Sequence, residues 1–407
     1  MPAGAGRRIG QNAPVDLEAF RWLLTGPGQR LLERATTIDD DPLRANAALR
    51  GEAEPAHVAA ALTQVSLRRR AAPKFGELAE RMYFTPEGLE QATRLRVAEH
   101  RAARLAAAGT GTVLDLGCGI GGDLVAFARA GITCAGVDLD AARVAVAEAN
   151  LAALGLGGAV TVADATTVDS SPFDVAYADP ARRSARGRSF DADSWTPPWS
   201  FVERLLQQPA CVKAAPGLPH ELVPDGVEAE WVSDHGEVKE VALWSGRLAT
   251  TDRRATVIPP PGPGQAAGGL ATLTTEDDPG AEVRDPGRFL YEPDGAVIRA
   301  GLVTAVAAGV HGGLLDGQIA WVTSDEAFRT PFARSFEVVE ELPFREKQLR
   351  AALRERGIGS LTIKTRGVSV VPDQLRKRLS LTGEQDATIV LTRARDRGVC
   401  FLVRPFR

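Results

Sequence analysis

The chain has 407 residues, of which 44% are hydrophobic and 25% are charged, and its formal net charge is −4. This length predicts more than one domain. No apolar run approaches the ~18 to 20 residues that a membrane-spanning helix needs. Residues 1–12 lack the apolar stretch of a secretion signal, and the four cysteines are too dispersed for a zinc site or a disulfide framework. We therefore expect a cytoplasmic protein that binds no membrane and no metal.

The charge is distributed unevenly along the chain. From Leu342 to the C-terminus there are 15 Lys and Arg against 6 Asp and Glu, a balance of +9, whereas residues 1–341 carry −13. A basic module of this kind is the electrostatic footprint of a protein that binds nucleic acid. A basic surface that only faces solvent is the alternative interpretation.

Helical patterns dominate residues 1–83, which we expect to form an all-helical N-terminal domain. Asp16 can cap a helix that runs through Leu24. Further helical patterns cover residues 42–49, 55–70 and 74–82.

A second type of helix signal opens the next part of the chain. Thr85 is followed by Pro86 and Glu87, which supplies the cap, the proline and the first-turn acid of a helix start. We expect this helix to run to Ala108 and to lead directly into a strand.

The strand that follows ends in a glycine-rich turn. Gly117, Gly119 and Gly122 have the G-x-G-x-x-G spacing, in which a ligand approaches backbone N–H groups at a helix N-terminus. A dinucleotide fits this spacing, but Asp115 lies at the strand end, two residues before the first glycine. A carboxylate at that place favours a cation. S-adenosyl-L-methionine presents its α-ammonium group there, so the sequence predicts this cofactor.

Three more predicted strands end in acidic residues. The run 132–137 ends in Asp138, placed to accept from ribose hydroxyls, and the run 159–163 ends in Asp164, placed to accept from the adenine amine. The run 173–178 ends in Asp179. Each acid alone is compatible with a helix cap or a turn, but ligands of open α/β sheets lie beyond the carboxyl ends of the strands. The predicted cofactor-binding residues are Thr85, Asp115, Gly117, Cys118, Gly119, Asp138, Leu139, Asp164 and Ala165. Tyr83 or Phe84 is expected to lie against the adenosine or, alternatively, to be buried at the helix start.

The remaining elements define the domain boundaries. Residues 211–215 form a fifth strand, and residues 229–233 with 237–245 form a hairpin of the type that distinguishes methyltransferases from dinucleotide folds. After a Pro-rich segment at 259–263 we expect a helix over 296–309. The final part predicts a small α+β layer, with helices at 345–356 and 372–379 and strands at 361–365, 388–393 and 399–404. The predicted domains are 1–83 (helical), 84–250 (cofactor-binding), 251–341 (linker and intermediate segment) and 342–407 (C-terminal).

Several of these motifs resemble known families. Residues 113–122 and 136–139 resemble the first two motifs of the class I S-adenosylmethionine-dependent methyltransferases, over about residues 80–248. Residues 84–87 and 118–122, with the acid-Pro strand end, are similar to the trimethylguanosine synthase branch. Residues 363–367, 375–379 and 388–392 resemble the THUMP-like domain of a bacterial family that carries Asp-Pro-Ala-Arg-Arg.

The resemblance implies an α/β fold with a Rossmann-like sheet and an antiparallel hairpin at its edge. The helical domain precedes this sheet and a small α+β THUMP-like domain follows it. It also implies RNA as a partner, because THUMP domains bind structured RNA.

The same resemblance implies the catalytic residues, with one departure. Amino-methyltransferases carry Asp, Asn or Ser followed by Pro-Pro and an aromatic residue, whereas here Ala181 and Arg182 follow Asp179 and Pro180. The carboxylate and the next carbonyl can still accept hydrogen bonds from an exocyclic amine and so position it for methyl transfer. The predicted catalytic residues are Asp179 and Pro180. The predicted substrate-binding residues are Arg182, Arg183, Trp195, Trp199, Arg376, Lys377 and Arg378, with loop packing as the alternative for the tryptophans.

These observations predict a methyltransferase that acts on a base nitrogen of RNA, either tRNA or rRNA. A small-molecule methyltransferase with a structural tail is the first alternative. A non-catalytic RNA-binding protein that retains the cofactor fold is the second, because fold alone does not prove activity.

Overall fold

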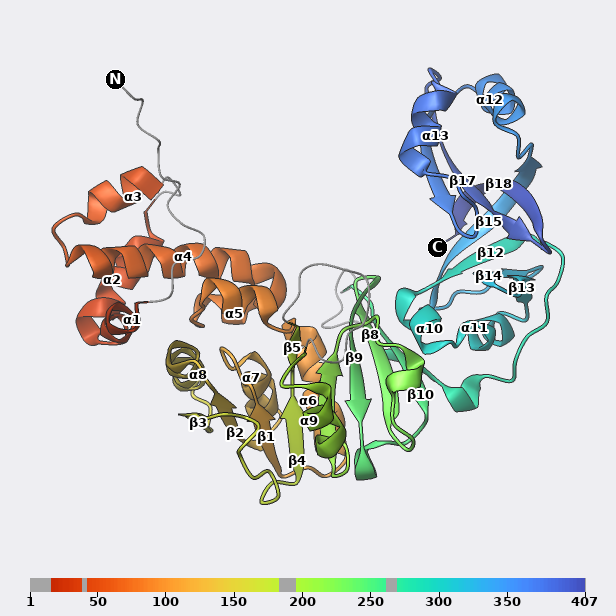
Figure 1. The fold of residues 1–407 in the computed structure, drawn as a ribbon. Coiled ribbons are helices and arrows are strands. Elements are labelled where there is room, and N and C mark those ends of the chain that lie inside the picture. Colours follow the sequence, from red (N-terminus) through yellow and green to blue (C-terminus); the bar gives the residue numbers. More distant parts are fainter. Residues whose placement is uncertain (1–15, 39–41, 183–194, 261–268, 407) are drawn as a thin grey trace, which may run out of the picture. The chain divides into compact units, whose positions relative to one another are not determined.

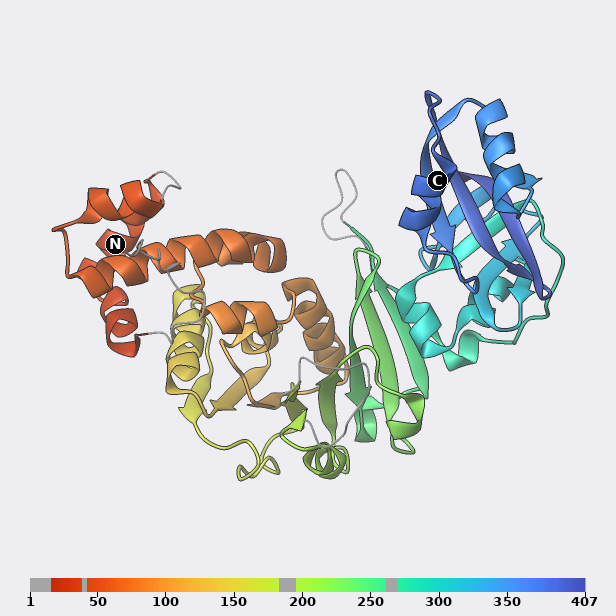
Figure 2. The same ribbon diagram turned by 45° about the horizontal axis from the view of Figure 1, so that its top comes forward.

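The computed structural model describes residues 16–38, 42–182, 195–260 and 269–406. The chain divides into two compact units (Figure 1, Figure 2). The first comprises Met1–Ala214 and Leu243–Ala249, and the second comprises Ala215–Ala242 and Thr250–Arg407.

The first unit begins with helices whose ends follow local capping rules. Asp16 accepts hydrogen bonds from the backbone N–H groups of Glu18 and Ala19, as predicted for a cap. Helix α4 continues to Phe75, beyond the expected end, and the helix expected over 74–82 is replaced by a 3-10 turn, Gly76–Glu80, because Gly76 has a positive φ of 55°. The helices are α1 (Leu17–Leu23), α2 (Gly26–Thr36), α3 (Pro42–Leu49) and α4 (Pro55–Phe75).

The single helix expected from Pro86 to Ala108 is two helices, α5 (Pro86–Gln91) and α6 (Leu95–Ala107). Ala92 between them has an extended ψ of 138°. The Lys74 ammonium donates hydrogen bonds to the carbonyls of Leu89, Glu90 and Ala92 at 2.7, 2.8 and 3.1 Å. These bonds satisfy carbonyl groups that a continuing helix would have used, so a distant lysine compensates for the break.

A parallel sheet forms the core of the first unit. Its strand order is β7-β4-β1-β2-β3, and all four pairings are parallel. Helices α7 (Gly122–Arg129), α8 (Ala141–Leu154) and α9 (Trp199–Leu205) alternate with the strands. The strands are β1 (Thr112–Leu116), β2 (Thr133–Asp138), β3 (Ala159–Val162), β4 (Val175–Ala178) and β7 (Ala210–Ala214). A short antiparallel ribbon, β5 (Ala181–Arg182) with β6 (Trp195–Thr196), follows β4.

The second unit begins with the predicted hairpin, β8 (Glu228–Asp234) and β9 (Glu237–Trp244), whose last two residues return to the first unit. In this unit the strand order is β11-β10-β8-β9. Strand β10 (Arg253–Ile258) pairs in parallel with β8, and β11 (Ala271–Thr274) pairs antiparallel with β10. These two strands extend the sheet beyond the hairpin.

The second unit ends in a seven-stranded sheet with the order β13-β14-β12-β15-β18-β17-β16. This sheet contains strands from both sides of Leu342, the residue at which the C-terminal domain was predicted to begin. The helix expected over 296–309 is two helices, because Gly301 has a positive φ of 69°. The strands are β12 (Phe289–Pro293), β13 (Gly313–Asp316), β14 (Ile319–Ser324), β15 (Ala333–Leu342), β16 (Ile358–Thr365), β17 (Gln385–Ala394) and β18 (Arg397–Phe406). The helices are α10 (Gly295–Ala300), α11 (Val303–Gly309), α12 (Glu346–Glu355) and α13 (Pro372–Leu379).

Candidate functional site

The carboxyl ends of the parallel strands bring several charged side chains to one edge of the sheet. Leu116 at the end of β1 lies in register with Val137 of β2 and Ala178 of β4. Strand β7 runs parallel beside β4. The edge therefore carries Asp115, Asp138 and Asp179 together with the β7 residue Lys213.

The glycine turn after β1 keeps this edge accessible. Gly117 and Gly119 have φ values of 104° and 54°, which favour glycine, and a Cβ atom at either would point into open space. Gly121 also has a positive φ, and a Cβ there would lie 3.0 Å from the Ala147 side chain. The first two glycines thus leave room for a ligand against the backbone, whereas the third allows α7 to approach α8.

Asp138 holds the glycine turn against β2. Its Oδ2 accepts a hydrogen bond from the Gly119 N–H at 3.0 Å, and its Oδ1 accepts one from the Asp140 N–H at 2.9 Å. The next side chain, Leu139, is 67% exposed. Asp138 is therefore fixed in place beside the turn, and Leu139 presents an apolar surface next to it.

Asp115 is the most unusual group at this edge. It is 1% exposed, and its Oδ1 has no hydrogen-bond partner among the residues that the structure describes. Burial raises the pKa of this carboxyl well above its ordinary value, and the negative charges of Asp123 and Asp179 raise it further. A buried acceptor without a donor is costly, so this oxygen is suited to a donor brought by a ligand.

A buried cation partly offsets these acids. Arg101 on α6 is 1% exposed and forms an ion pair with Asp123 at the start of α7. Its guanidinium also lies 4.7 Å from the centre of the Tyr177 ring. Arg101 lowers the pKa of Asp115 to a smaller extent than burial raises it. The sequence motifs did not identify this group.

Asp179 is paired with a residue that the motif analysis missed. Its Oδ2 accepts a hydrogen bond from the Lys213 ammonium at 2.5 Å. The next residue, Pro180, is buried. The sequence does contain one indication of this pair, since Lys213 is the single charged residue of the apolar strand Ala210–Ala214. A lysine in such a strand needs a charged partner.

The other predicted cofactor residues have well-defined local roles. Asp164 is exposed, and its Oδ1 accepts hydrogen bonds from the N–H and hydroxyl of Thr166, which lower the pKa of Asp164. Ala165 beside it is half-buried, and Cys118 in the glycine turn is buried, which raises the pKa of its thiol. Thr85 is buried and accepts a hydrogen bond from the Gly88 N–H at 2.9 Å, as expected for a cap.

The two aromatic residues before Thr85 are buried beside the N-terminal helices, which agrees with the alternative of burial at the helix start. Tyr83 packs edge-to-face against Phe20 of α1, and Phe84 lies against Phe75 of α4. Both are buried. Their side chains therefore belong to the contact with the N-terminal helices.

The tryptophans predicted near the substrate are buried. Trp195 and Trp199 are 3% and 6% exposed, and their ring centres lie 5.3 Å apart in an edge-to-face arrangement. Trp195 lies opposite Arg182 in the β5–β6 ribbon. Arg183 falls outside the described residues.

The predicted basic residues of the C-terminal part lie on α13 in the second unit. Arg376, Lys377 and Arg378 are exposed in the last turn of the helix, where cations are favoured by the helix dipole. Arg376 forms an ion pair with Asp373 at 2.7 Å, and Arg378 forms one with Glu346 at 2.9 Å. Part of this basic charge is therefore compensated within the unit.

The described part of the chain was searched for a membrane-spanning helix and for a metal-binding group of side chains. None of its helices is long and apolar enough to cross a membrane. Over the same residues, no group of three or more His, Cys, Asp or Glu side chains is arranged to hold a metal ion.

The geometry agrees with comparisons to known proteins. An uncharacterized S-adenosylmethionine-dependent methyltransferase of Mycobacterium tuberculosis is 39% identical over 343 residues, which cover 80% of this chain and 90% of that protein. The chain belongs to the S-adenosylmethionine-dependent methyltransferases. The methyltransferase also matches three family models, described as a methyltransferase domain (residues 113–182), a THUMP domain-like region (333–405) and a domain of unknown function (16–71).

A solved structure extends the comparison of the fold. A "putative methyltransferase" from Porphyromonas gingivalis W83 superposes with a TM-score of 0.73 at 22% identity and covers 96% of this methyltransferase and 98% of its own chain. The predicted family, enzyme class, cofactor and fold class are therefore confirmed. The unpaired Oδ1 of Asp115 and the open space at Gly117 and Gly119 fit S-adenosyl-L-methionine.

The raised pKa of Asp115 predicts how its replacement changes stability. In Asp115→Asn, the methyltransferase without cofactor should gain roughly 1 to 3 kcal/mol, the cost of an uncompensated buried group, at pH values above the raised pKa. The gain should disappear in acid, because stability linked to a raised carboxyl pKa is present below the ordinary pKa and is lost as pH rises through the raised one. Urea denaturation across this pH range measures the difference.

The exposed residue Asp169 provides a control of opposite sign. Hydrogen bonds from the N–H and hydroxyl of Ser171 lower its pKa, so its charge stabilises the fold above its ordinary pKa. Asp169→Asn should therefore gain nothing as pH rises. A pH-independent difference between wild type and Asp115→Asn would contradict the account of Asp115.

Proposed function

We propose that this methyltransferase transfers a methyl group to an exocyclic amine nitrogen of a base in RNA, either tRNA or rRNA. The observation that carries the proposal is the ion pair of Asp179 and Lys213 at the cofactor edge, 2.5 Å between carboxylate oxygen and ammonium. An oriented carboxylate directly after β4 is an acceptor for an amine N–H. The THUMP domain-like match to residues 333–405 supports RNA as the substrate class.

In the proposed cofactor arrangement, the predicted residues contact different parts of S-adenosyl-L-methionine. Asp115 accepts from the α-ammonium group, and Asp138 accepts from the ribose hydroxyls while it holds Gly119. Leu139, Asp164 and Ala165 contact the adenine. Residues 117–119 run beneath the cofactor, and the helix start at Thr85 lies over it.

When bound, S-adenosyl-L-methionine supplies the methyl group of its sulfonium. The sulfur keeps both electrons of the broken carbon–sulfur bond. Asp179 and the Pro180 carbonyl accept hydrogen bonds from the amine and point its lone pair at the methyl carbon. As the carbon–nitrogen bond forms and the carbon–sulfur bond breaks, the nitrogen becomes positive and then loses its proton to solvent water. The Asp179 carboxylate stabilises that developing charge, and Lys213 holds the carboxylate in one orientation.

The RNA contacts follow from charge and position. Arg182 and Arg183 follow the catalytic pair after one intervening residue, Ala181, and arginine can bind phosphate in a bidentate manner. Trp195 and Trp199 are buried against each other. We therefore propose that they stabilise the β5–β6 ribbon that carries Arg182. Arg376, Lys377 and Arg378 provide phosphate contacts on the THUMP-like domain.

Identification of the methylated nucleoside tests the proposal. RNA from a strain without the gene is incubated with the enzyme and S-adenosyl-L-methionine labelled in the methyl group, then digested to nucleosides and separated. We expect label on one nucleoside that carries a methylated exocyclic amine. Label only on carbon or ribose oxygen would refute the nitrogen target, and label only on small molecules would favour a small-molecule methyltransferase.

The Asp179→Asn substitution separates catalysis from scaffolding. Asn keeps the size and one acceptor oxygen but removes the charge, so transfer at saturating cofactor should fall by ~10²-fold or more. Cofactor affinity should remain within about twofold, because Asp179 faces the substrate amine. Single-turnover methyl transfer and calorimetry measure the two quantities.

Asp169→Asn serves as the matched control, because it makes the same chemical change in an exposed turn. The control should keep the wild-type rate. A normal rate in Asp179→Asn, with only a lowered melting temperature, would leave Asp179 as a structural residue.

The basic residues of α13 predict a salt dependence. Replacement of Arg376, Lys377 and Arg378 by Ala should weaken RNA binding irrespective of sequence and reduce the slope of log affinity against log salt by ~0.7 to 0.9 per lost phosphate contact. Fluorescence anisotropy over a salt series measures this slope. Arg34→Ala, at an exposed arginine of α2, is the control, and an unchanged slope in the triple variant would indicate a basic surface that only faces solvent.

A further inference from the structure

Helix α4 of the N-terminal domain is hydrogen-bonded along its length to the backbone of residues 81–92. Gln64 donates to the Phe84 carbonyl at 2.8 Å and accepts from the Phe84 N–H at 3.0 Å. Arg68, one helical turn later, donates to the Met82 carbonyl at 2.9 Å. Lys74 donates to three carbonyls at the end of α5. Side chains of one helix therefore replace the backbone partners that a neighbouring strand would provide.

A second buried amide holds the same segment from α8. Asn150 is 0% exposed and accepts from the Tyr83 N–H at 2.6 Å. Its amide also donates to the carbonyl of Tyr83 at 3.0 Å and to that of Ile120 at 2.8 Å. Because Ile120 lies within the glycine turn, Asn150 joins the segment directly to the turn.

The start of α5 also presses on the glycine turn. A Cβ atom at Gly88 would lie 2.3 Å from Cγ2 of Ile120, so only glycine permits this approach. The adjacent Gly119 N–H donates to Asp138. A continuous series of contacts thus runs from Gln64 through Phe84 and Gly88 to Ile120 and the cofactor edge.

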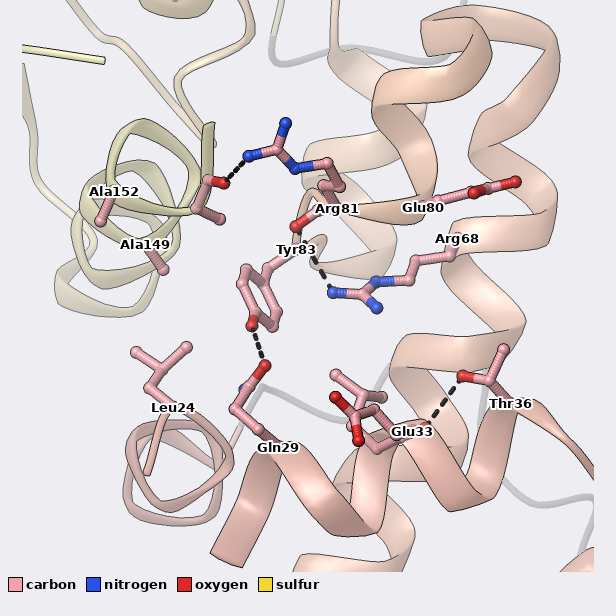
Figure 3. A pocket seen from close by; sticks show the side chains of 12 residues that line it. Leu24, Gln29, Glu33, Thr36, Arg68, Glu80, Arg81, Tyr83, Ala149 and Ala152 are labelled. Carbon is pink, nitrogen blue, oxygen red and sulfur yellow. Dashed lines mark hydrogen bonds between the residues drawn. The ribbon is translucent and has the colours of Figure 1, made fainter. Parts of the chain in front are cut away.

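A pocket borders the segment on its other side. A cavity of about 510 Å³ lies beside Tyr83, between α1, α2 and α4 on one side and α8 on the other (Figure 3). Across it the Tyr83 hydroxyl donates to Gln29 at 3.1 Å, and the Arg81 guanidinium donates to the Ala153 carbonyl (Figure 3). The segment is therefore held both by the burial of Tyr83 and Phe84 and by the directional hydrogen bonds from Gln64 and Asn150.

We infer that the N-terminal helical domain, through side chains of its helix α4, is a positioning element of the cofactor site. Gln64 and Arg68 hold residues 82–84, and this sets the start of α5 against the glycine turn in the cofactor-binding arrangement. Without Gln64, the buried N–H and carbonyl of Phe84 lose their partners, the segment relaxes, and cofactor binding must reorder it. The inference rests on the proposed place of the cofactor at the glycine turn and is independent of the RNA substrate.

The test is calorimetric titration of S-adenosyl-L-methionine into the full chain. Gln64→Leu keeps the approximate shape of the side chain but removes both hydrogen bonds, and its Kd should rise by ~10-fold or more. Lys74→Met removes hydrogen bonds at the other end of the segment, and the Lys74 side chain is only half-buried. It therefore provides a second variant if Gln64→Leu does not fold. Hydrogen exchange at the Phe84 amide should become faster in Gln64→Leu. A loss of packing elsewhere in the domain, such as in α2, would not produce this local change.

A control variant separates positioning from stability. Leu31→Val reduces packing in the core of the same domain and removes none of the hydrogen bonds to residues 81–92, so it should lower the melting temperature and keep the Kd within about twofold. Gln64→Leu and Lys74→Met that also keep the wild-type Kd would overturn the inference. Equal losses of affinity in Leu31→Val and Gln64→Leu would overturn it as well.

A further variant distinguishes this inference from the proposed cofactor site. Gly119→Val places a side chain in the open space of the turn at a positive φ, so it should abolish binding. Loss of binding in Gly119→Val with wild-type affinity in Gln64→Leu would reject only the positioning role. Retained binding in Gly119→Val would reject the cofactor placement itself.

Discussion

The buried carboxylate of Asp115 is the constraint on which the rest of the site depends. It lies within β1, where burial and the charges of Asp123 and Asp179 disfavour its ionised form. A ligand cation that reaches its unpaired oxygen removes much of that cost. The glycine turn, which leaves open space for a ligand, follows β1 directly, so the same short stretch contains both the buried carboxyl group and the proposed place of the cofactor.

The surrounding elements fix the glycine turn beside this carboxylate and bring the proposed substrate acceptor, Asp179, to the same edge. Asp138 fixes the turn from β2, and the α4 side chains fix the segment that leads to α5. Asp179 carries its own cation, Lys213, on the neighbouring strand. Two of the carboxyl groups at this edge differ in their surroundings. Among the described residues, Oδ1 of Asp115 has no donor, which suits the cofactor, whereas Asp179 is oriented by a lysine, which suits an amine.

Sequence reasoning succeeded where a local pattern has a local cause. Apolar runs that end in acids predicted β1, β2 and β4, and Thr85 with Pro86 predicted the start of α5. It failed where the partner lies far away in the chain. Nothing near Gln64 or Lys74 in the sequence indicates a bond to residues 84 or 89–92, and the bonds of Lys74 compensate for the helix break at Ala92. Burial of the tryptophans agrees with the alternative of loop packing that the sequence left open.

Proton release on cofactor binding tests the central role of Asp115 most directly. Between the ordinary pKa of an aspartate and the raised pKa of Asp115, the enzyme without cofactor holds a proton that an incoming ammonium group should displace. Calorimetry of S-adenosyl-L-methionine binding in buffers of different ionisation enthalpy counts these protons. The account predicts release by the wild type in this pH range and a smaller release, by about one proton, in Asp115→Asn. Identical proton counts in the two proteins would contradict it.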